Sequence, residues 1–339
     1  MRAASVGHAS GSVGLAPLTQ VLLELLLAAS TILPSHGTVR TDSLWSSALG
    51  VTKHYLVYLP PSYATSTTRR YPVAYYLHGL NGDETNWVQL GHLDAAMDSL
   101  IAGGGPEMIV VMPDGDNSWY TTWNSMGDYN ACKRDTARKE PASEFCVPWP
   151  HYDDYVARDL VHHVDSVYRT MPDRAHRAIA GLSMGGYGAV ELALQYPDVW
   201  SAAASHSGTL QLMYAGPHPY AGHDVYAANM DQLQQSSGGA WPSLQEALGK
   251  DTAAWRSRDP LTRIERLKAA KPAMVPALYF DVGRDDPFVD QNRAFDGALT
   301  ELHVPHEYHE YPGTHNWDYW SAHVGQSLAW IQKQFTGVD

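Results

Sequence analysis

The stretch IAGLSMGGYGAVELAL, residues 179–194, decides how the rest of the chain is interpreted. It places Ser183 between Gly181 and Gly185 in the spacing G-x-S-x-G, after a short apolar run and before a segment with helical periodicity. In this context a serine is expected at a sharp strand-to-helix turn that lifts its hydroxyl off the backbone. Gly181, Gly185 and Gly186 permit such a turn because they lack a Cβ atom. The stretch therefore predicts a serine nucleophile at position 183.

Short apolar runs alternate with longer amphipathic segments on both sides of this stretch, which is the pattern of an α/β fold. Apolar runs of this kind are typical of strands that are buried on both faces of a mostly parallel sheet. Strands are expected at residues 53–60, 71–79, 107–115, 176–183, 200–208, 276–283 and 306–313. Helices are expected on both faces, at residues 152–170, 185–197, 289–304 and 316–335.

Two polar stretches interrupt this alternation, residues 115–151 and residues 208–258. Both follow the carboxyl end of a predicted strand, which is the edge where open α/β sheets bind ligands. We therefore expect loops inserted over the site and one domain spanning residues 38–339. The first insertion holds Cys132 and Cys146. In an exported protein these would form a disulfide, whose loop closure stabilises by about 3 kcal/mol, whereas in a cytosolic protein they would be free thiols.

Two later loops supply the acid and the base that a serine nucleophile requires. Asp286 follows a predicted strand in the sequence RDDPF, and Asp285 and Asp281 remain alternatives for the acid. His315 follows the last predicted strand in the sequence THNWDYW. These loops leave the same edge of a parallel sheet as Ser183, in the chain order serine, aspartate, histidine. The sequence thus predicts Asp286 as the acid and His315 as the base.

Four other histidines fit the role of the base less well. His303, His306 and His309 precede or lie within the last predicted strand, so they are expected to face solvent or to pack. His78 comes before the serine in the chain and fits the end of a strand better than a base.

Catalysis by such a serine also needs two backbone N–H groups that stabilise the oxyanion. One belongs to Met184, the residue after the nucleophile. The other is expected from the loop HGLNGDETNW, residues 78–87, where Leu80 is the predicted donor.

The composition excludes several classes of partner and cofactor. The net charge of −13 is spread along the 339 residues, so the surface repels nucleic acid and anionic lipid. The 17 histidines show no ligand spacing such as H-E-x-x-H, and we expect neither a metal nor an organic cofactor.

The aromatic composition is unusual, since the chain has 20 Tyr and 11 Trp but only 5 Phe. Tyr and Trp suit wet, concave surfaces that bind sugars or aromatic groups.

The N-terminal run VLLELLLAASTIL, residues 21–33, is shorter than the roughly 20 residues that a helix needs to cross a bilayer. An apolar run of this length followed by small residues is typical of a secretory leader, here with cleavage near residues 35–37. Glu24 interrupts the run, and a buried N-terminal helix is the alternative. We expect residues 1–37 to be a signal peptide and the protein to be secreted or periplasmic; the alternative is a cytoplasmic protein.

Four motifs together resemble the esterase D superfamily of α/β-hydrolases. They are YYLHGLNG at residues 75–82, GLSMGGYGA at 181–189, DVGRDDPF at 281–288 and YPGTHNWDYW at 311–320. The resemblance extends from residue 50 to residue 335. It implies the α/β-hydrolase fold and a carboxylic ester hydrolase. It also implies the following roles: Ser183 as nucleophile, Asp286 as acid, His315 as base, and Leu80 and Met184 as oxyanion donors.

The superfamily includes S-formylglutathione hydrolases, antigen 85 mycolyltransferases, and microbial feruloyl and acetyl-xylan esterases. The loop GLNGDETNW lacks the cysteine that S-formylglutathione hydrolases carry soon after GL, and no long apolar segment suits the lipids of the antigen 85 branch. The resemblance therefore implies an exported esterase for short-chain acyl, feruloyl or acetyl esters, either small or linked to polysaccharide. An acyltransferase or a thioesterase is the alternative. The Trp and Tyr side chains of residues 115–151 would stack on a sugar or a phenolic acyl group.

Overall fold

A computed structural model describes residues 1–4, 7, 36–123, 129–134, 141 and 146–336 of the chain. Two compact units are distinguished, residues 1–34 and residues 35–339. The predicted signal peptide falls almost entirely outside the described residues. Within the part of the chain that is described, no helix has both the length and the apolar character needed to cross a membrane.

Eight strands of the described residues form one sheet, in the order β1-β2-β4-β3-β5-β6-β7-β8. β1 pairs antiparallel with β2, and β2 antiparallel with β4, whereas the six strands from β4 to β8 run parallel. The strands are β1 (Thr38–Ser46), β2 (Val51–Leu59), β3 (Val73–Leu77), β4 (Ile109–Pro113), β5 (Arg177–Leu182), β6 (Ala202–His206), β7 (Ala277–Gly283) and β8 (His306–Tyr311). The sheet is mostly parallel, as the sequence predicts.

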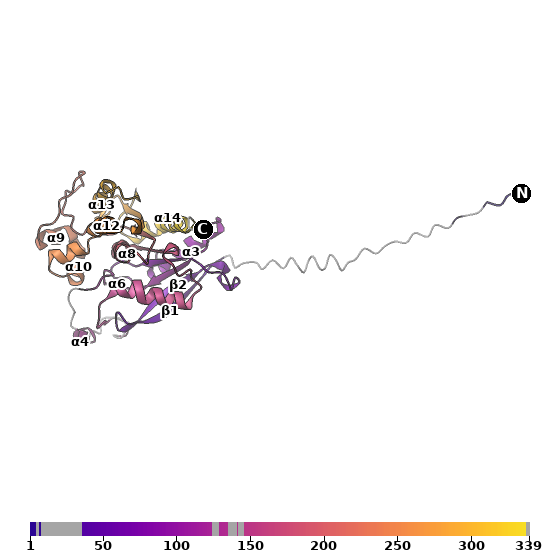
Figure 1. The fold of residues 1–339 in the computed structure, drawn as a ribbon, viewed down its shortest axis with the longest axis horizontal. Helices are drawn as coiled ribbons and strands as arrows, with labels where there is room; N and C mark the ends of the chain where they lie inside the picture. The colour runs from indigo at the N-terminus through magenta and orange to yellow at the C-terminus, as the bar shows by residue number, and fades with distance from the viewer. Residues whose placement is uncertain (5–6, 8–35, 124–128, 135–140, 142–145, 337–339) are drawn as a thin grey trace. The chain divides into compact units, whose positions relative to one another are not determined.

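Helices cover both faces of this sheet (Figure 1). On one face α14 (Trp317–Thr336) packs against α3 (Leu93–Ala102), and on the other α8 (Met184–Gln195) packs against α12 (Pro260–Ala270). The remaining α-helices and π turn are α2 (Asn86–Gln89), α4 (Tyr129–Cys132), α6 (Tyr152–Asp154), η2 (Tyr155–Leu160), α7 (Val161–Val167), α9 (Met230–Ser237), α10 (Trp241–Leu248), α11 (Thr252–Ser257) and α13 (Val289–Glu301). Short 3₁₀ turns are η1 (Pro61–Ala64), η3 (Arg174–His176), η4 (Gly238–Ala240) and η5 (Pro272–Met274).

The core lies on both faces of the sheet because the central strands β3, β4, β5 and β6 are buried at every position. In β3 the five residues VAYYL are all buried. Successive side chains of a strand point to opposite faces, so Tyr75 packs edge-on against Trp200 on one face and Tyr76 against Trp87 on the other. This double burial explains why the runs predicted as strands are nearly continuous rather than alternating.

All seven predicted strands and all four predicted helices are present, within a few residues of the expected bounds. The helix predicted at residues 152–170 is continuous from 152 to 167 and contains one π turn. Sequence analysis missed β1, α3 and α12. The residues of β1, TVRTDSLWS, lie at the edge of the sheet, mostly exposed or half-buried, and carry little apolar signal.

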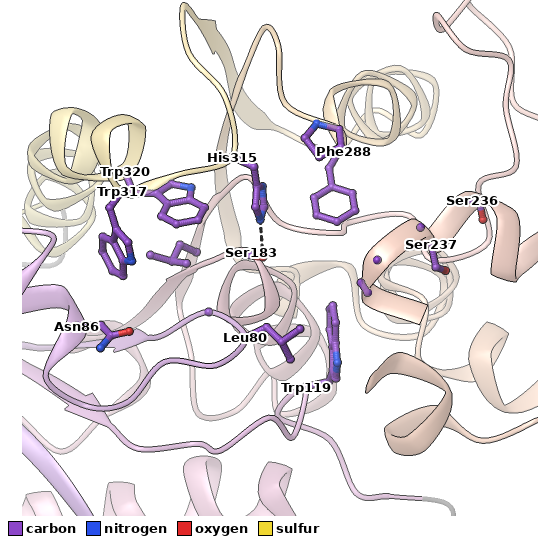
Figure 2. Close-up of a pocket in the computed structure, with 16 residues that line it drawn as sticks. Leu80, Asn86, Trp119, Ser183, Ser236, Ser237, Phe288, His315, Trp317 and Trp320 are labelled. Atoms are coloured by element: carbon purple, nitrogen blue, oxygen red, sulfur yellow. Dashed lines mark hydrogen bonds between the residues drawn. The ribbon is translucent and has the colours of Figure 1, made fainter. Parts of the chain in front are cut away.

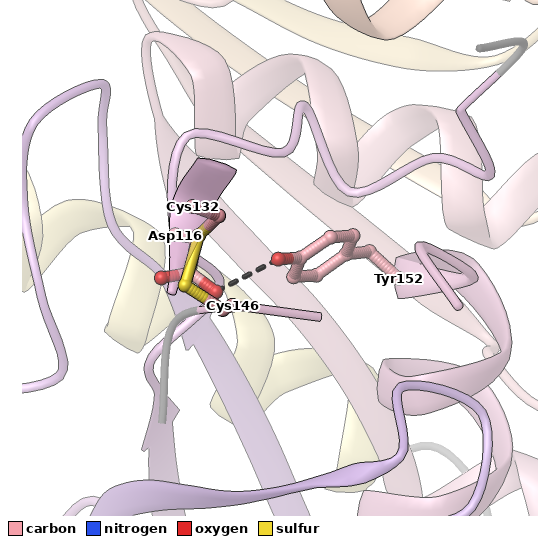
Figure 3. Close-up of a disulfide and its surroundings, with 4 residues drawn as sticks. All are labelled: Asp116, Cys132, Cys146 and Tyr152. Carbon is pink, nitrogen blue, oxygen red and sulfur yellow. Dashed lines mark hydrogen bonds between the residues drawn. A yellow bond between two sulfur atoms is a disulfide. The ribbon is translucent and has the colours of Figure 1, made fainter. Parts of the chain in front are cut away.

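A disulfide joins Cys132 and Cys146, whose Cα atoms are 5.7 Å apart. Figure 3 shows this disulfide together with Tyr152, whose hydroxyl donates a hydrogen bond to Asp116 at 2.8 Å. The pairing predicted for an exported protein is therefore present. Residues 124–128, 135–140 and 142–145 of the same insertion lie outside the described residues.

Gly185 is required by a close approach of two backbone segments, and this yields a test of the fold. A Cβ atom added there would lie 2.4 Å from the carbonyl oxygen of Leu77 and 2.5 Å from that of His78. We expect Gly185→Ala to destabilise the protein by about 1–3 kcal/mol, as overpacking does.

Thermal unfolding followed by circular dichroism would measure this loss. Gly325→Ala in α14 is the matched control, since nothing lies within 4 Å of its added Cβ. Alanine favours helix over glycine, so this variant should be unchanged or slightly more stable. Equal midpoints for the two variants would contradict the packing described.

Candidate active site

Ser183 occupies a strained turn between β5 and α8. Its φ of 53° and ψ of −117° are rarely adopted by a residue with a side chain. Its N–H donates a hydrogen bond to the carbonyl oxygen of His206 at 2.8 Å, which ties the turn to the end of β6. Such strain persists where the surrounding structure enforces it. The turn presents the Ser183 hydroxyl at the carboxyl edge of the sheet.

The structure brings Ser183, His315 and Asp286 together in one hydrogen-bonded row. Figure 2 shows the bond between His315 and Ser183. His315 Nε2 lies 2.8 Å from Ser183 Oγ, and His315 Nδ1 lies 2.9 Å from Asp286 Oδ2. Asp286 is buried, and its other oxygen accepts a hydrogen bond from the N–H of Phe288 at 2.8 Å. With Asp286 accepting at Nδ1, the imidazole proton lies on Nδ1 and leaves Nε2 free to accept from the serine. This arrangement can deprotonate the serine hydroxyl.

The alternative acids lie elsewhere. Asp285 is exposed, and its backbone N–H donates to the carbonyl oxygen of Gly313. Asp281 is fully buried and lies 2.8 Å from Nδ1 of His206 rather than beside His315.

The alternative histidines also have other contacts. His303 Nδ1 faces the carbonyl oxygen of Thr300, and His306 Nε2 faces Asp296 at 2.8 Å. His309 lies on β8, where its ring stacks on Tyr311. Among the described residues, none of the three forms a hydrogen bond with Ser183.

His78 holds the loop that follows β3. Its Nε2 accepts a hydrogen bond from the N–H of Gly115 at 2.9 Å, which places the ring proton on Nδ1. Nδ1 therefore donates to the carbonyl oxygen of Gly79, 2.8 Å away. Because the C=O and N–H of a trans peptide point in opposite directions, this bond turns the N–H of Leu80 away from His78. A Cβ atom on Gly79 would lie 3.5 Å from that of Ser183, so the loop packs directly on the serine turn.

A buried charge cluster lies behind this loop. The ammonium group of Lys53 forms ion pairs with Asp114 and with Asp116, the latter at 2.9 Å. Burial alone would raise the pKa of Asp114, but the nearby Lys53 charge holds that pKa well below its ordinary value. Burial would lower the pKa of Lys53, but the two carboxylates raise it above its ordinary value. The cluster fixes the start of the first insertion beside His78.

A cavity of 370 Å³ opens over Ser183 and His315. Figure 2 shows Trp317, Trp320 and Asn86 on one side of the serine, and Trp119, Phe288 and the segment 236–240 on the other. Leu80 also lines it. The walls therefore carry four large aromatic side chains, with serine and glycine at one end. Phe288, Trp317 and Trp320 stand in the motifs DVGRDDPF and YPGTHNWDYW, so the sequence carried a signal for them. Residues 236–240 gave no such signal.

Trp119 brings both insertions into contact at the cavity. Its φ is 54° and that of Tyr120 is 51°, two strained values in succession. Trp119 Nε1 donates to Ser243 Oγ in the second insertion at 2.8 Å, and the Tyr120 hydroxyl donates to the carbonyl oxygen of His78 at 3.1 Å. These bonds hold the indole against the cavity. We expected Trp and Tyr side chains of residues 115–151 to face the substrate. Trp119 does line the cavity, whereas Trp149 is exposed.

One group of potential metal ligands occurs among the described residues, away from this cavity. Atoms of His151, Asp153 and Asp154 lie within 4.8 Å of one another. The carboxylates already have partners, because Gln195 donates to Asp153 at 2.8 Å and Arg158 pairs with Asp154 at 2.7 Å. The group therefore fits a hydrogen-bonded surface cluster, and we assign no metal to it.

Comparison with known families matches residues 46–331 to the family described as "Putative esterase". The chain belongs to this family. The sequence of this esterase-family chain is 29% identical over 279 residues to an esterase of Mycobacterium tuberculosis, covering 80% of the chain and 54% of that protein. It is also 25% identical over 260 residues to an acetyl esterase of Caldicellulosiruptor saccharolyticus, covering 76% of the chain and 82% of that protein. The chain thus spans little more than half the length of its mycobacterial relative.

The solved structure of a ferulic acid esterase is similar as well. It superimposes with a TM-score of 0.65 and 26% sequence identity, covering 88% of this chain and 99% of that chain. The α/β-hydrolase fold and the esterase D resemblance predicted from the sequence are therefore confirmed.

The contrast between adjacent aspartates gives a direct test of this site. Asp286→Asn keeps the shape of the side chain but lets the amide donate to His315, which favours the wrong imidazole tautomer. We expect it to lower kcat for p-nitrophenyl acetate by about ten-thousandfold, as this change does in serine hydrolases. Asp285→Asn, an exposed neighbour with the same chemistry, should retain kcat within a factor of about two because a surface substitution of this kind is nearly neutral. Similar losses in both variants would rule out the assignment.

Proposed function

We propose that this protein is a serine esterase that hydrolyses carboxylic esters through Ser183, His315 and Asp286. The observation that carries the proposal is the row of contacts at 2.8 and 2.9 Å at the floor of an aromatic cavity. Family membership and the named esterase relatives support it.

In the acylation step, Ser183 Oγ attacks the ester carbonyl while His315 Nε2 accepts its proton. Asp286 stabilises the imidazolium that forms and keeps the ring oriented. The negative charge that develops on the carbonyl oxygen is stabilised by the N–H groups of Leu80 and Met184. Met184 is the first residue of α8, where N–H groups lack partners within the helix and the helix dipole favours an anion. His315 then returns the proton to the departing alcohol.

In the deacylation step, water takes the place of the alcohol. His315 removes a proton from the water, and the resulting hydroxide attacks the acyl-enzyme carbonyl. The same two N–H groups stabilise the second oxyanion. Collapse of this intermediate breaks the bond to Ser183 Oγ, which recovers its proton from His315, and the carboxylic acid leaves. No cofactor takes part in this scheme.

The substrates that we propose are esters of short-chain or aromatic acids, such as acetyl and feruloyl esters, on small alcohols or on polysaccharide. The cavity volume of 370 Å³ lies at the lower end of the range for small-molecule sites. Trp119, Phe288, Trp317 and Trp320 offer faces and edges on which a phenolic ring or a sugar can pack. An acetyl esterase and a ferulic acid esterase are among the similar proteins.

We also propose export to a secreted or periplasmic location. The apolar run at residues 21–33 is typical of a leader, and the disulfide between Cys132 and Cys146 suits an oxidising compartment.

The first experiment is a set of initial rates for wild type and Ser183→Ala. The substrates are p-nitrophenyl acetate, butyrate and octanoate, methyl ferulate, acetylated xylan and S-formylglutathione. We expect Ser183→Ala to lower kcat by about a million-fold, because loss of the nucleophile abolishes the acyl-enzyme route. A loss below tenfold would overturn the proposal.

The same rates decide the substrate class. A kcat/KM for methyl ferulate or acetylated xylan at least tenfold above those of the p-nitrophenyl esters would support the substrates proposed. A lead for S-formylglutathione would identify a thioesterase instead, and product analysis with added sugar acceptors would reveal acyl transfer.

His78 offers a separate test of the oxyanion arrangement. His78→Leu removes the donor that holds the carbonyl of Gly79, so the N–H of Leu80 loses its fixed direction. We expect kcat for p-nitrophenyl acetate to fall at least tenfold with little change in KM, since loss of one oxyanion donor costs roughly a hundredfold or more.

His78→Asn is the matched control. Its amide N–H₂ occupies the place of Nδ1 and can still donate to Gly79, while both variants lose the contact with Gly115. The Asn variant should therefore retain more of kcat than the Leu variant. Equal losses would show that the bond to Gly79 does not position Leu80.

A further inference from the structure

A second row of serine, histidine and aspartate lies buried beneath the cavity. His206 and Asp281 are both 0% exposed, and His206 Nδ1 lies 2.8 Å from Asp281 Oδ2, within ion-pair distance but without the geometry of a hydrogen bond. His206 Nε2 lies 2.8 Å from Ser327 Oγ on α14. The other oxygen of Asp281 accepts a hydrogen bond from the hydroxyl of Tyr319, also on α14, at 2.8 Å. None of these residues lines the cavity, so they cannot touch a substrate there.

This buried row is attached to each of the three residues proposed for catalysis. The carbonyl oxygen of His206 accepts from the N–H of Ser183 at 2.8 Å. Asp281 lies on β7, the strand that leads to Asp286, and pairs in register with His206. Tyr319 lies in the first turn of α14, which follows directly on the loop carrying His315.

The loop of His315 also rests on Tyr319. A Cβ atom on Gly313 would lie 2.8 Å from Tyr319 Cδ2, and Gly313 has a φ of 136°, a value that side chains rarely allow. The tyrosine ring therefore limits how closely the loop can approach α14. The hydrogen bond from the tyrosine hydroxyl to Asp281 holds the ring in place. Movement of Tyr319 would move His315.

The complete burial of the polar side chains of His206, Asp281 and Ser327 requires an explanation. Burying a charge or a hydroxyl costs free energy unless it is paired, and apolar side chains of similar size would fill the space at no such cost. Apolar packing is not directional, however, whereas hydrogen bonds and ion pairs fix relative orientation. A polar unit is therefore suited to holding three separate chain segments in one alignment.

We propose that His206, Asp281, Ser327 and Tyr319 form a positioning unit that aligns Ser183, Asp286 and His315. This inference rests on the proposed esterase function. The unit makes no bond to substrate; it acts through the backbone of Ser183, the strand before Asp286 and the helix after His315. Because a misplacement of 1 Å can cost roughly a hundredfold in rate, loosening the unit should lower kcat more than it lowers stability or substrate affinity.

Tyr319→Phe is the main variant, since it removes one hydroxyl and leaves the ring on Gly313. We expect kcat for p-nitrophenyl acetate to fall about tenfold, part of the loss that misplacement can cause, with KM changed less than twofold. The rate of labelling by a fluorophosphonate should fall by a similar factor, because it depends on the same serine attack.

Tyr168→Phe is the matched control. The hydroxyl of Tyr168 donates to the carboxylate of Asp42 at 2.8 Å, the same kind of bond at the same length but beside β1, far along the sheet order from β5 to β8. Asp42 is only partly buried and keeps two other donors, so this variant should lower the unfolding midpoint less than Tyr319→Phe does, and it should leave kcat unchanged. Equal effects of the two variants on kcat would overturn the proposal, because Tyr319 would then have only a structural role.

Ser327→Ala and the pair Asp281→Asn and Asp281→Ala extend the test if Tyr319→Phe folds poorly. Ser327→Ala releases the other end of His206 and should also lower kcat with KM unchanged. Asn at position 281 can still accept from Tyr319, so it should retain more of kcat than Ala. Wild-type kcat in Ser327→Ala, or equal kcat in the two Asp281 variants, would contradict the proposal.

Failure of the proposed function gives a different result. If Ser183→Ala still hydrolyses the ester, the esterase assignment itself is wrong. If Ser183→Ala is inactive but Tyr319→Phe matches wild type, only the positioning unit is wrong.

Discussion

The site depends on one backbone contact, between the start of α8 and the end of β3. At Gly185 the two segments are so close that a single added carbon would lie within 2.5 Å of two carbonyl oxygens. This contact sets the distance from the serine turn to the loop of His78 and Leu80. The nucleophile and the proposed oxyanion donors are consequently fixed by main chain, and side chains only refine their directions.

The remaining proposed catalytic residues lie on loops at the same edge of the sheet. Parallel strands bring the ends of β5, β7 and β8 together, so residues distant in sequence converge without long connections. Loops of this kind tolerate movement, so an acid and a base on two loops could move relative to the fixed serine. In our proposal the buried pair of His206 and Asp281 limits this movement, because it joins the end of β6, which binds the N–H of Ser183, to α14, the helix after His315.

The sequence predicted those parts of this arrangement in which the backbone needs a particular type of residue at a particular position. The seven predicted strands, most of them buried, follow from apolar runs, and the contact between Ser183 and His315 follows from glycine spacing and chain order. It favoured Asp286 as the acid but left Asp281 and Asp285 as alternatives, because all three lie near the end of one strand and only side-chain direction separates them. β1 went unrecognised because an edge strand need not be apolar.

The floor and the walls of the cavity come from different parts of this chain. The floor of the cavity consists of strand ends and the turn at Ser183, where neighbouring backbone leaves no room for substitution. Its walls include Trp119 from one insertion and residues 236–240 from the other, joined by the bond from Trp119 to Ser243. Insertions can change in length and composition without disturbing the sheet, because they leave it at strand ends. For the esterase that we propose, the choice of acyl group would therefore depend on the walls. A change at the contact between Trp119 and Ser243 would alter the ester accepted, while the floor would perform the same reaction.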